Sequence, residues 1–486
     1  MGNIIFNHKN PKLNITRQSC PKGLYLRPLH RNHRPIAKNK KTVLAATIAV
    51  FFSVIIGTAY ATNFYEVIHV DAVNMGNLTI GYVDIAYDGK CSLVEAIRTA
   101  NNETISNTDC GNPSSLDHVI ELPEKANFLL NGYMDTADGF NGLPSITSTI
   151  IINGHGALIR RSSEAETPEF RIFHIAGNGN LTINQFTVSN GLTPYGSSGG
   201  SDRTNEGGGI LNRGILTINR CSFLDNKSFV GGALVNLSGA ATITDSRFAN
   251  NSVESSGGAI VTNGGDLTLN NCTLSDNSVI TQGTGGGAIL VFGNTVTILN
   301  NCTLSDNSSA YLGGAISILN SGSDPGITLN NCTLSGNSAA ENMGGGIYND
   351  GARVTLANTI IANSSTNSGN CVKSGSLPMF IMSGHNLSDD NTCNSLTPGA
   401  VIIDNPNLGS LRNNGGATQT HALLNGSPAI DAGDDAICKS SPINNKDQRG
   451  RYRDQGLHCD IGAYELPQTT FFVIPTHNGK VITLGL

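Results

Sequence analysis

One ten-residue stretch occurs three times in the chain, first as Leu269-Asn270-Asn271-Cys272-Thr273-Leu274-Ser275-Asp276-Asn277-Ser278. The same letters return at 299–308, and 329–338 differs only in having Gly336 in place of Asp. Small-residue runs precede each unit and follow the last, namely Gly257-Gly258-Ala259-Ile260, Gly286-Gly287-Ala288-Ile289, Gly313-Gly314-Ala315-Ile316 and Gly344-Gly345-Gly346-Ile347. A fixed period of this kind is the signature of a repeat architecture.

Residues 267–274 alternate as a β-strand does, with Leu and Cys on one face and Thr on the other. The column equivalent to Cys272 reads Phe186, Cys221, Ser246, Cys272, Cys302, Cys332 and Thr359, at intervals of 25 to 35 residues. This period without a helix predicts an all-β fold, a right-handed parallel β-helix (a single-stranded solenoid) with one coil per repeat over residues 146–365. The strand through Ile298 is one residue out of step, which predicts a β-bulge there.

Five residues after that column stands an asparagine in five coils: Asn226, Asn251, Asn277, Asn307 and Asn337. Stacked amides can donate to and accept from one another, so we expect a buried structural ladder. The cysteine column is best explained by buried thiols that fill the core as small apolar side chains.

The first 61 residues predict an export signal. Ten of the 30 Lys and Arg fall in residues 1–42, which hold no acid, and 43–61 are uncharged. The exit Ala59-Tyr60-Ala61 favours cleavage after Ala61 by a signal peptidase, and an uncleaved membrane anchor is the alternative. The remaining 20 basic residues face all 36 acidic ones, and this excess of acid argues against nucleic-acid binding.

Six cysteines outside the repeats form sequence-local couples, Cys91/Cys110, Cys371/Cys393 and Cys438/Cys459. In an exported chain we interpret them as three disulfides. Each would close a loop of ~20 residues, which is worth about 3 kcal/mol in the chain-entropy model.

Residues 62–145 are predicted to form an N-terminal cap that covers the first coil. Its helix, Ser92 to Asn101, begins with a capping box formed by Ser92 and Glu95. The segment Cys91-Ser92-Leu93-Val94-Glu95-Ala96 resembles the domain named for its Cys-Ser-Leu-Arg-Glu-Ala signature, found near the N-terminus of exported bacterial proteins. Val94 replaces the arginine of that signature, so no role of the arginine carries over.

Two further resemblances concern the repeats and the C-terminal region, residues 366–486. The Gly-Gly-Ala-Ile runs and the Phe-x-x-Asn units (223–226 and 248–251) are similar to repeats of chlamydial polymorphic outer-membrane proteins. Asn425 to Gly433, Asp447-Gln448-Arg449-Gly450 and Cys459 to Glu465 resemble the choice-of-anchor type Q domain of exported bacterial surface proteins. These resemblances imply a secreted or cell-surface location.

Parallel β-helices of the pectin-lyase-like kind often host carbohydrate-active enzymes, so a polysaccharide lyase or glycoside hydrolase is the alternative function. Three fragments are similar to polygalacturonase motifs: Asn107-Thr108-Asp109, Gly154-His155-Gly156 and Gly433-Asp434-Asp435. Hydrolysis needs carboxylates gathered around one bond, whereas these fragments fall in the cap, an early coil and the C-terminal region. We therefore predict no catalytic residue.

Six aspartates of the C-terminal region could gather around calcium, although turn capping explains them equally well: Asp431, Asp434, Asp435, Asp447, Asp454 and Asp460. We expect no other cofactor. The outward faces are expected to be plain and solvated, with a threonine row that could instead bind a regular surface or glycan: Thr217, Thr242, Thr268, Thr328 and Thr355.

The sequence thus favours an exported, monomeric β-helix with a structural or adhesive role toward a surface partner or glycan. Contact with a membrane is expected only through the N-terminal segment, if it is not cleaved.

Overall fold

The computed structural model describes residues 66–75, 78–81, 88–103, 109–110, 117–194, 203–319, 326–365, 367–374, 379–396, 401–468, 471–475 and 481–485. The export signal and the cleavage site expected after Ala61 lie outside these residues. One compact unit extends from Phe64 to Leu486.

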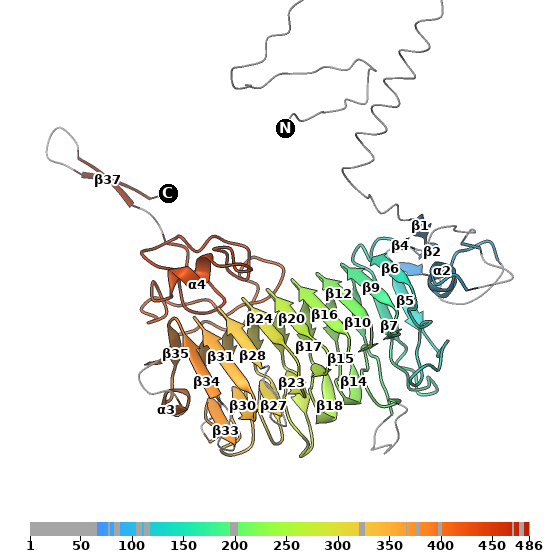
Figure 1. Cartoon of the computed structure of the whole chain (residues 1–486). Coiled ribbons are helices and arrows are strands. Elements are labelled where there is room, and N and C mark those ends of the chain that lie inside the picture. Colours follow the sequence, from blue (N-terminus) through green and yellow to red (C-terminus); the bar gives the residue numbers. More distant parts are fainter. Residues whose placement is uncertain are drawn as a thin grey trace, which may run out of the picture. The chain divides into compact units, whose positions relative to one another are not determined.

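The predicted right-handed parallel β-helix is confirmed, with about 9 turns, here called rungs (Figure 1). Its first sheet has eleven strands among the described residues: β1 (Glu66–His69), β4 (Asp117–Glu121), β6 (Thr149–Asn153), β9 (Asn180–Asn184), β12 (Ile215–Asn219), β16 (Ala240–Thr244), β20 (Leu267–Asn270), β24 (Thr297–Asn300), β28 (Ile327–Asn330), β31 (Arg353–Ala357) and β34 (Met379–Ser383). All neighbours in this sheet pair in parallel.

The second sheet has thirteen strands in the described part: β2 (Ala72–Met75), β3 (Leu78–Gly81), β5 (Asn127–Leu130), β7 (Leu158–Arg161), β10 (Thr187–Ser189), β13 (Ser222–Leu224), β17 (Arg247–Ala249), β21 (Thr273–Ser275), β25 (Thr303–Ser305), β29 (Thr333–Ser335), β32 (Ile360–Ala362), β35 (Asn386–Ser388) and β36 (Val401–Ile403). Only β2 and β3 pair antiparallel there. The first two sheets thus continue on both sides of residues 146–365.

The third sheet closes the coil with β8 (Phe173–Ile175), β11 (Ile210–Asn212), β15 (Leu234–Leu237), β19 (Ile260–Asn263), β23 (Ile289–Phe292), β27 (Ile316–Leu319), β30 (Ile347–Asp350) and β33 (Cys371–Ser374). A short fourth sheet holds β14 (Lys227–Val230), β18 (Ser252–Ser256), β22 (Ser278–Val279) and β26 (Ser308–Ser309). A hairpin of β37 (Phe471–Pro475) and β38 (Val481–Gly485) follows the β-helix.

The prediction of a β-bulge at Ile298 is wrong. Strand β24 keeps regular register with both neighbours, Thr268 pairing with Ile298 and Ile298 with Thr328. Thr297 is buried and Ile298 is half-buried. In this strand a threonine therefore takes the inward position that a leucine usually holds, and an isoleucine takes the outward position that a threonine usually holds. Among the described strand pairs, a register shift occurs instead between Ser228 and Val230 of β14.

Two turn positions of the ten-residue unit require a left-handed backbone. Asn271, Asn301 and Asn331 have φ between 50° and 56°, and Asp276 and Asp306 have φ of 56°. Asparagine and aspartate adopt this conformation more readily than most residues, and glycine does so at no steric cost. Gly336, with φ of 72°, stands at the aspartate position of the third unit and satisfies the same requirement.

The asparagines of the predicted ladder stack inside the rungs. The Nδ2 of Asn277 donates to Oδ1 of Asn307 at 2.9 Å, and the Nδ2 of Asn307 donates to Oδ1 of Asn337 at 2.9 Å. Equivalent bonds of 3.0 and 2.9 Å join Asn226, Asn251 and Asn277. All five side chains are buried, so their hydrogen bonds replace those that water would make.

At the N-terminal end, helix α2 (Leu93–Ala100) packs against β4 and β6. Its capping box is formed as the sequence suggests, because Ser92 Oγ accepts from Glu95 N and Glu95 Oε2 accepts from Ser92 N. The three predicted disulfides are present, between Cys91 and Cys110, Cys371 and Cys393, and Cys438 and Cys459. Cys221, Cys272, Cys302 and Cys332 are free and buried.

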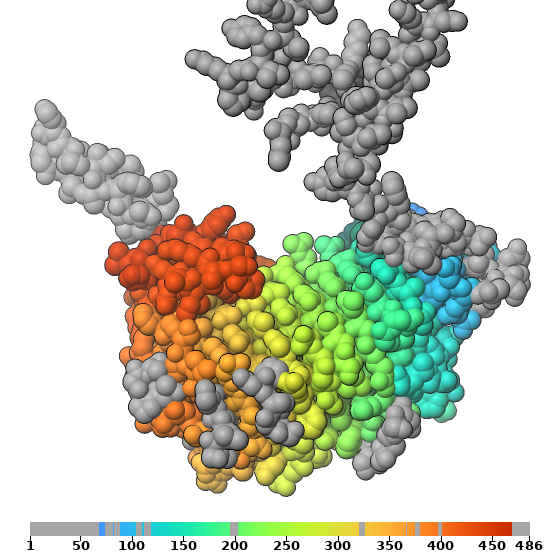
Figure 2. Space-filling model, in the orientation of Figure 1, coloured from blue at the N-terminus to red at the C-terminus, as the bar shows by residue number. Residues whose placement is uncertain are grey.

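After β36 the chain folds back and covers the side of the β-helix. This segment, residues 404–468 with helix α4 (Asp435–Lys439), is here called the return segment. Figure 2 shows it, in red, lying against the orange and yellow rungs. A short helix, α3 (Thr392–Leu396), precedes it and carries Cys393.

Candidate functional site

The turn between the first and second sheets forms one continuous edge of the β-helix, here called the turn edge. It consists of left-handed residues on successive rungs: His155, Gln185, Arg220, Asp245, Asn271, Asn301, Asn331 and Asn358. The return segment bonds to this edge from Asn271 to Asn358.

Gln448 is the central contact of the return segment with the repeats. Its Nε2 donates to Thr273 Oγ1 at 2.9 Å, and its Oε1 accepts from Thr303 Oγ1 at 2.6 Å. On the third unit, Thr333 Oγ1 accepts from the backbone N–H of Ala463 at 3.0 Å. The outward face of the three units is therefore covered, and the expectation of a plain, solvated face is wrong for this column.

Close packing accompanies these hydrogen bonds. Gly462 lies against Ile360 and Thr333, and a Cβ at this glycine would approach side-chain atoms of both residues to 2.8 Å. Ile360, Ala362 and Leu387 form a second apolar cluster with residues of the return segment, namely Ala422, Leu423, Ala429, Ile461 and Tyr464. The return segment is thus held by an apolar core as well as by polar bonds.

A buried ionic group stabilises the return segment internally. Arg449 and Asp447 pair at 2.6 Å, and the guanidinium of Arg449 stacks 3.6 Å from the ring centroid of Tyr464. Arg453 is fully buried and donates to Asn301 Oδ1 at 2.9 Å, which ties the group to the turn edge.

Burial raises the pKa of two carboxyl groups in this ionic group. The pKa of Asp460 rises to about 6. The pKa of Glu465 rises to about 8, because burial and the neighbouring Asp460 outweigh Arg453 at 3.6 Å. Each group therefore keeps its proton to a higher pH than an exposed carboxyl does.

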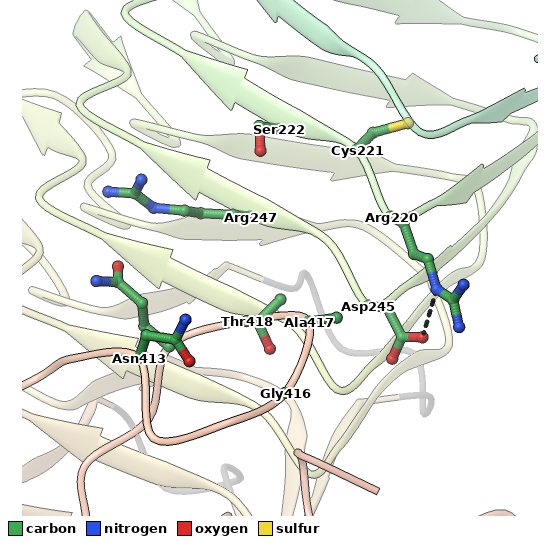
Figure 3. A pocket seen from close by; sticks show the side chains of 10 residues that line it. Arg220, Cys221, Ser222, Asp245, Arg247, Asn413, Gly416, Ala417 and Thr418 are labelled. Atoms are coloured by element: carbon green, nitrogen blue, oxygen red, sulfur yellow. Dashed lines mark ion pairs between the residues drawn. The ribbon is translucent and has the colours of Figure 1, made fainter. Parts of the chain in front are cut away.

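The return segment covers the turn edge only from Asn271 onward. Upstream of Asn271 the turn edge is open. A cavity of about 480 Å³, here called the arginine groove, lies at this junction (Figure 3). It is lined by Arg220, Cys221, Ser222, Asp245, Arg247, Asn413, Gly416, Ala417, Thr418 and Gln419. Its two walls come from segments about 170 residues apart in the chain, the rungs of β13 and β17 and the loop 413–419.

The two arginines of the groove differ in their partners. Arg220 and Asp245 occupy the same turn position on adjacent rungs and approach to 3.6 Å. Asp245 also accepts a hydrogen bond from Asn271 at 3.1 Å. Arg247 begins β17, and within the described residues its side chain has neither an acidic partner nor a hydrogen bond, although its Nε is shielded from solvent.

A second cavity of about 390 Å³ continues along the turn edge and shares Arg220 and Asp245 with the arginine groove. Its floor is a row of amides on adjacent rungs. Asn219 donates to Asn184 at 3.0 Å, and Asn184 donates to Asn153 at 2.8 Å. The two cavities therefore form a continuous polar surface across several rungs.

The residues that line the two cavities are amides, hydroxyls, arginines and a single carboxylate. Asp245 is the only carboxylate among the residues that line both cavities, whereas glycoside hydrolysis uses a pair. No group of three or more His, Cys, Asp or Glu arranged to hold a metal is found among the described residues. Amides, hydroxyls and guanidinium groups can bind hydroxyl-rich or anionic ligands without such groups.

The structure also brings together a serine, a histidine and an aspartate that no sequence motif indicated. Ser145 Oγ lies 2.7 Å from His174 Nδ1, and His174 Nε2 lies 3.1 Å from Asp138 Oδ2. Arg213 pairs with Asp138 at 2.6 Å. The side chain of His174 is only 3% exposed, so the trio anchors the loop 131–146 rather than presenting a nucleophile.

Arg171 reinforces this anchor. Its buried guanidinium donates to the carbonyls of Asp138 and Arg203 and to Asn141 Oδ1. Burial lowers the pKa of Arg171 to about 10 and also lowers the pKa of His174, which is therefore neutral at neutral pH. Arg171 thereby joins the loop 131–146 to residues 203–206.

The residues of the polygalacturonase-like fragments have separate, local partners. His155 pairs with Glu121 at 2.6 Å, Asp109 accepts from the backbone of Gly89, and Asp434 caps α4. Asn107 and Thr108 lie outside the described residues.

The aspartates weighed for calcium likewise bind protein groups. Asp460 accepts from the backbone of Asp431 and Leu466, and Asp435 accepts from Cys459. Calcium binding stays a prediction. The threonine row of the first sheet is half-buried or exposed, with Ile298 interrupting it between Thr268 and Thr328.

The match to a family model agrees with the fold. Residues 144–361 match the family model described as "Right handed beta helix region". A solved structure titled "Crystal structure of pectate lyase Pel9A" is similar with a TM-score of 0.38 and 14% identity, over 76% of this chain and 95% of that chain. A likeness this distant carries no information about activity. The comparison with curated proteins finds no match. From its repeats, its sheets and this family match, the chain is a right-handed parallel β-helix repeat protein.

Proposed function

We propose that the protein is exported and acts outside the cell or at its surface as a non-catalytic binding protein. In this proposal the β-helix is a rigid scaffold, and the open part of its turn edge binds a glycan. The observation that carries the proposal is the polar surface of the two cavities, where amides, hydroxyls and two arginines accompany a single carboxylate.

The disulfides support an extracytoplasmic setting, because such bonds persist in oxidising compartments. The basic leader with its apolar run supports export through an N-terminal signal. The resemblance of 425–465 to the choice-of-anchor Q domain supports a surface location. Within the described residues, no helix has the length and apolar character that crossing a membrane requires.

A glycan suits this surface for a physical reason. Sugars present rows of hydroxyl groups, and the stacked amides at Asn153, Asn184 and Asn219 present donors and acceptors at the spacing of successive rungs. The groove contains no aromatic side chain among its lining residues, so binding would depend on hydrogen bonds and charge.

The test combines binding with turnover. Purified exported protein is titrated with a panel of bacterial and plant oligosaccharides by calorimetry, and the same mixtures are assayed for released sugar ends. The expected result is saturable binding without turnover, weakened by Asn184→Leu. Turnover that survives repurification would overturn the non-catalytic role, and absence of binding across the panel would overturn the glycan ligand.

N-terminal sequencing and fractionation test the location. A mature N-terminus at Thr62 in a medium or surface fraction is expected. Retention of an intact leader in the cytoplasm would contradict export.

A further inference from the structure

The arginine groove contains a cation, Arg247, that no acidic side chain of the described residues pairs with. Among the described residues, neither an ion pair nor a hydrogen bond involves the side chain of Arg247, and its Nε is shielded from solvent. A guanidinium group carries five donors and is always charged, and in Arg247 the shielded Nε has lost hydration without gaining a protein partner among the described residues. The groove is therefore incomplete by itself, and an anion would complete it.

Arg220 is placed to contribute to the same site. Its side chain is 62% exposed and lies 3.6 Å from Asp245, which is longer than a charge-assisted hydrogen bond. Asp245 is additionally held by Asn271, so this carboxylate is shared between two donors. One negative charge thus faces two guanidinium groups, and the groove keeps a net positive charge.

The opposite wall of the groove is fixed in position. Thr418 Oγ1 donates to the carbonyl of Asn271 at 2.8 Å and accepts from Gln448 Nε2 at 2.9 Å. Asn413 is held through its Oδ1, which accepts from the backbone of Gly415, so its amide NH2 group remains able to donate. Figure 3 shows Asn413 and Thr418 on the return segment beside Arg247. The site is therefore preorganised and needs no closure of a loop.

The positive charge is local. The chain after the leader has 20 basic against 36 acidic residues, and this excess of acid repels anions at long range. A ligand must therefore gain its affinity from short-range contacts with the arginines and from neutral hydrogen bonds along the amide row. A single oxyanion on a hydroxyl-rich molecule satisfies both conditions, and the volume of about 480 Å³ falls within the range of ligand pockets.

We propose that the arginine groove binds the anionic group of an acidic glycan, with Arg247 as the principal and Arg220 as the second binding residue. This inference rests on the proposed glycan binding and specifies the class of glycan. The shared chemistry of the ligand is an oxyanion carried by a sugar ring, either a carboxylate or a sulfate ester.

The experiment uses the exported protein and four probes: an oligosaccharide of glucuronic acid, a sulfated oligosaccharide, a neutral glucose oligosaccharide of equal length, and sodium sulfate alone. Affinities are measured by calorimetry at two salt concentrations for the wild type, Arg247→Gln, Arg247→Lys and Arg220→Gln. Lys227→Gln is the matched control, because it removes the same charge from an exposed position on the fourth sheet, in the rung of Arg220 and one rung before Arg247.

We expect an acidic oligosaccharide to bind, and Arg247→Gln to weaken this binding by about tenfold or more. Arg247→Lys should recover part of the loss, Arg220→Gln should cost less, and Lys227→Gln should leave the affinity unchanged. Whether the uronate or the sulfated probe binds more tightly identifies the source of the oxyanion. Unchanged thermal unfolding of the variants shows that the fold is retained.

Three outcomes would overturn the inference. If the neutral oligosaccharide binds as tightly as the acidic ones and Arg247→Gln has no effect, glycan binding stands but its acidic specificity fails. If none of the oligosaccharides binds, both proposals fail. Binding of sodium sulfate with the same affinity as the acidic oligosaccharides would show an adventitious anion site and also overturn the inference.

Discussion

Thr303 and Gln448 lie 145 residues apart in the chain, yet the hydroxyl of Thr303 donates a hydrogen bond of 2.6 Å to the side-chain carbonyl of Gln448. The amide group of Gln448 meanwhile donates to Thr273 one rung earlier. One glutamine therefore joins two rungs of the β-helix to the return segment, and all three side chains are buried.

Replacing Gln448 with Leu is expected to loosen the return segment. The change leaves the buried hydroxyl of Thr303 without its acceptor and removes one donor from Thr273, whose hydroxyl still donates to the carbonyl of Gln419. An unsatisfied buried group costs roughly 1–3 kcal/mol. We expect urea unfolding of the return segment to lose at least about 2 kcal/mol of stability and limited proteolysis to cleave within 404–468. Gln455→Leu, at an exposed position, is the control. Equal protease resistance of the two variants would contradict the role of Gln448.

The asparagine ladder makes a second prediction. Asn307→Leu removes the acceptor for both the side chain and the backbone N–H of Asn277, and also the donor to Asn337. It should lower the free energy of unfolding by at least about 2 kcal/mol, whereas Asn294→Leu at an exposed turn should have little effect. Thermal unfolding of both variants measures the difference, and equal midpoints would argue against the ladder.

The return segment should become less stable as the pH rises. The pKa values of Asp460 and Glu465 are raised to about 6 and about 8 in the folded protein. The folded state thus holds protons that the unfolded chain has released, and the resulting stabilisation is full below about pH 4 and is lost as the pH rises to about 8. Hydrogen exchange within 404–468 should therefore quicken between pH 5 and 8, after correction for the intrinsic exchange rate. In Glu465→Gln this dependence should flatten. An unchanged slope in that variant would contradict the assignment to Glu465.

The loop 131–146 should show the opposite dependence. Burial and the neighbouring Arg171 lower the pKa of His174, so the unfolded chain binds a proton more readily than the folded one. The corresponding stabilisation is full above pH 6.5 and is lost as the pH falls. Hydrogen exchange in the loop should thus quicken on acidification from pH 7 to 5, relative to the intrinsic rate, and His174→Gln should remove most of the change. The anchoring role would be wrong if the wild-type loop stayed equally protected at both pH values.

Features determined by local spacing could be predicted from the sequence. The period of Leu, Cys and Asn determines the coil, its inward columns and its ladder, since each depends on residues one rung apart. The capping box of α2 depends on residues three positions apart. The prediction of a β-bulge at Ile298 was wrong. A buried threonine is tolerated at an inward position when the backbone register is kept with both neighbouring strands.

The arginine groove could not be predicted, because its two walls meet only after the return segment has folded back. Neither Arg247 nor Asn413 belongs to a motif, and their proximity depends on the position of Gln448 on the repeats. The sequence did contain one indication that another part of the chain covers the repeats. Thr273, Thr303 and Thr333 are identical at outward positions, where a solvated surface would tolerate variation. Invariance of an outward residue within a repeat indicates that something covers it.

The contacts of the return segment also have a consequence for how the protein can change in length. Thr273 and Thr303 must lie under Gln448 while Thr333 lies under Ala463, so the spacing of these three rungs is matched to one rigid partner. Duplication or deletion of a repeat between Asn271 and Asn358 would break this correspondence, although the solenoid itself would still stack. Gain or loss of whole rungs is therefore compatible with the structure only upstream of the arginine groove. The number of ten-residue units is fixed by the segment that covers them.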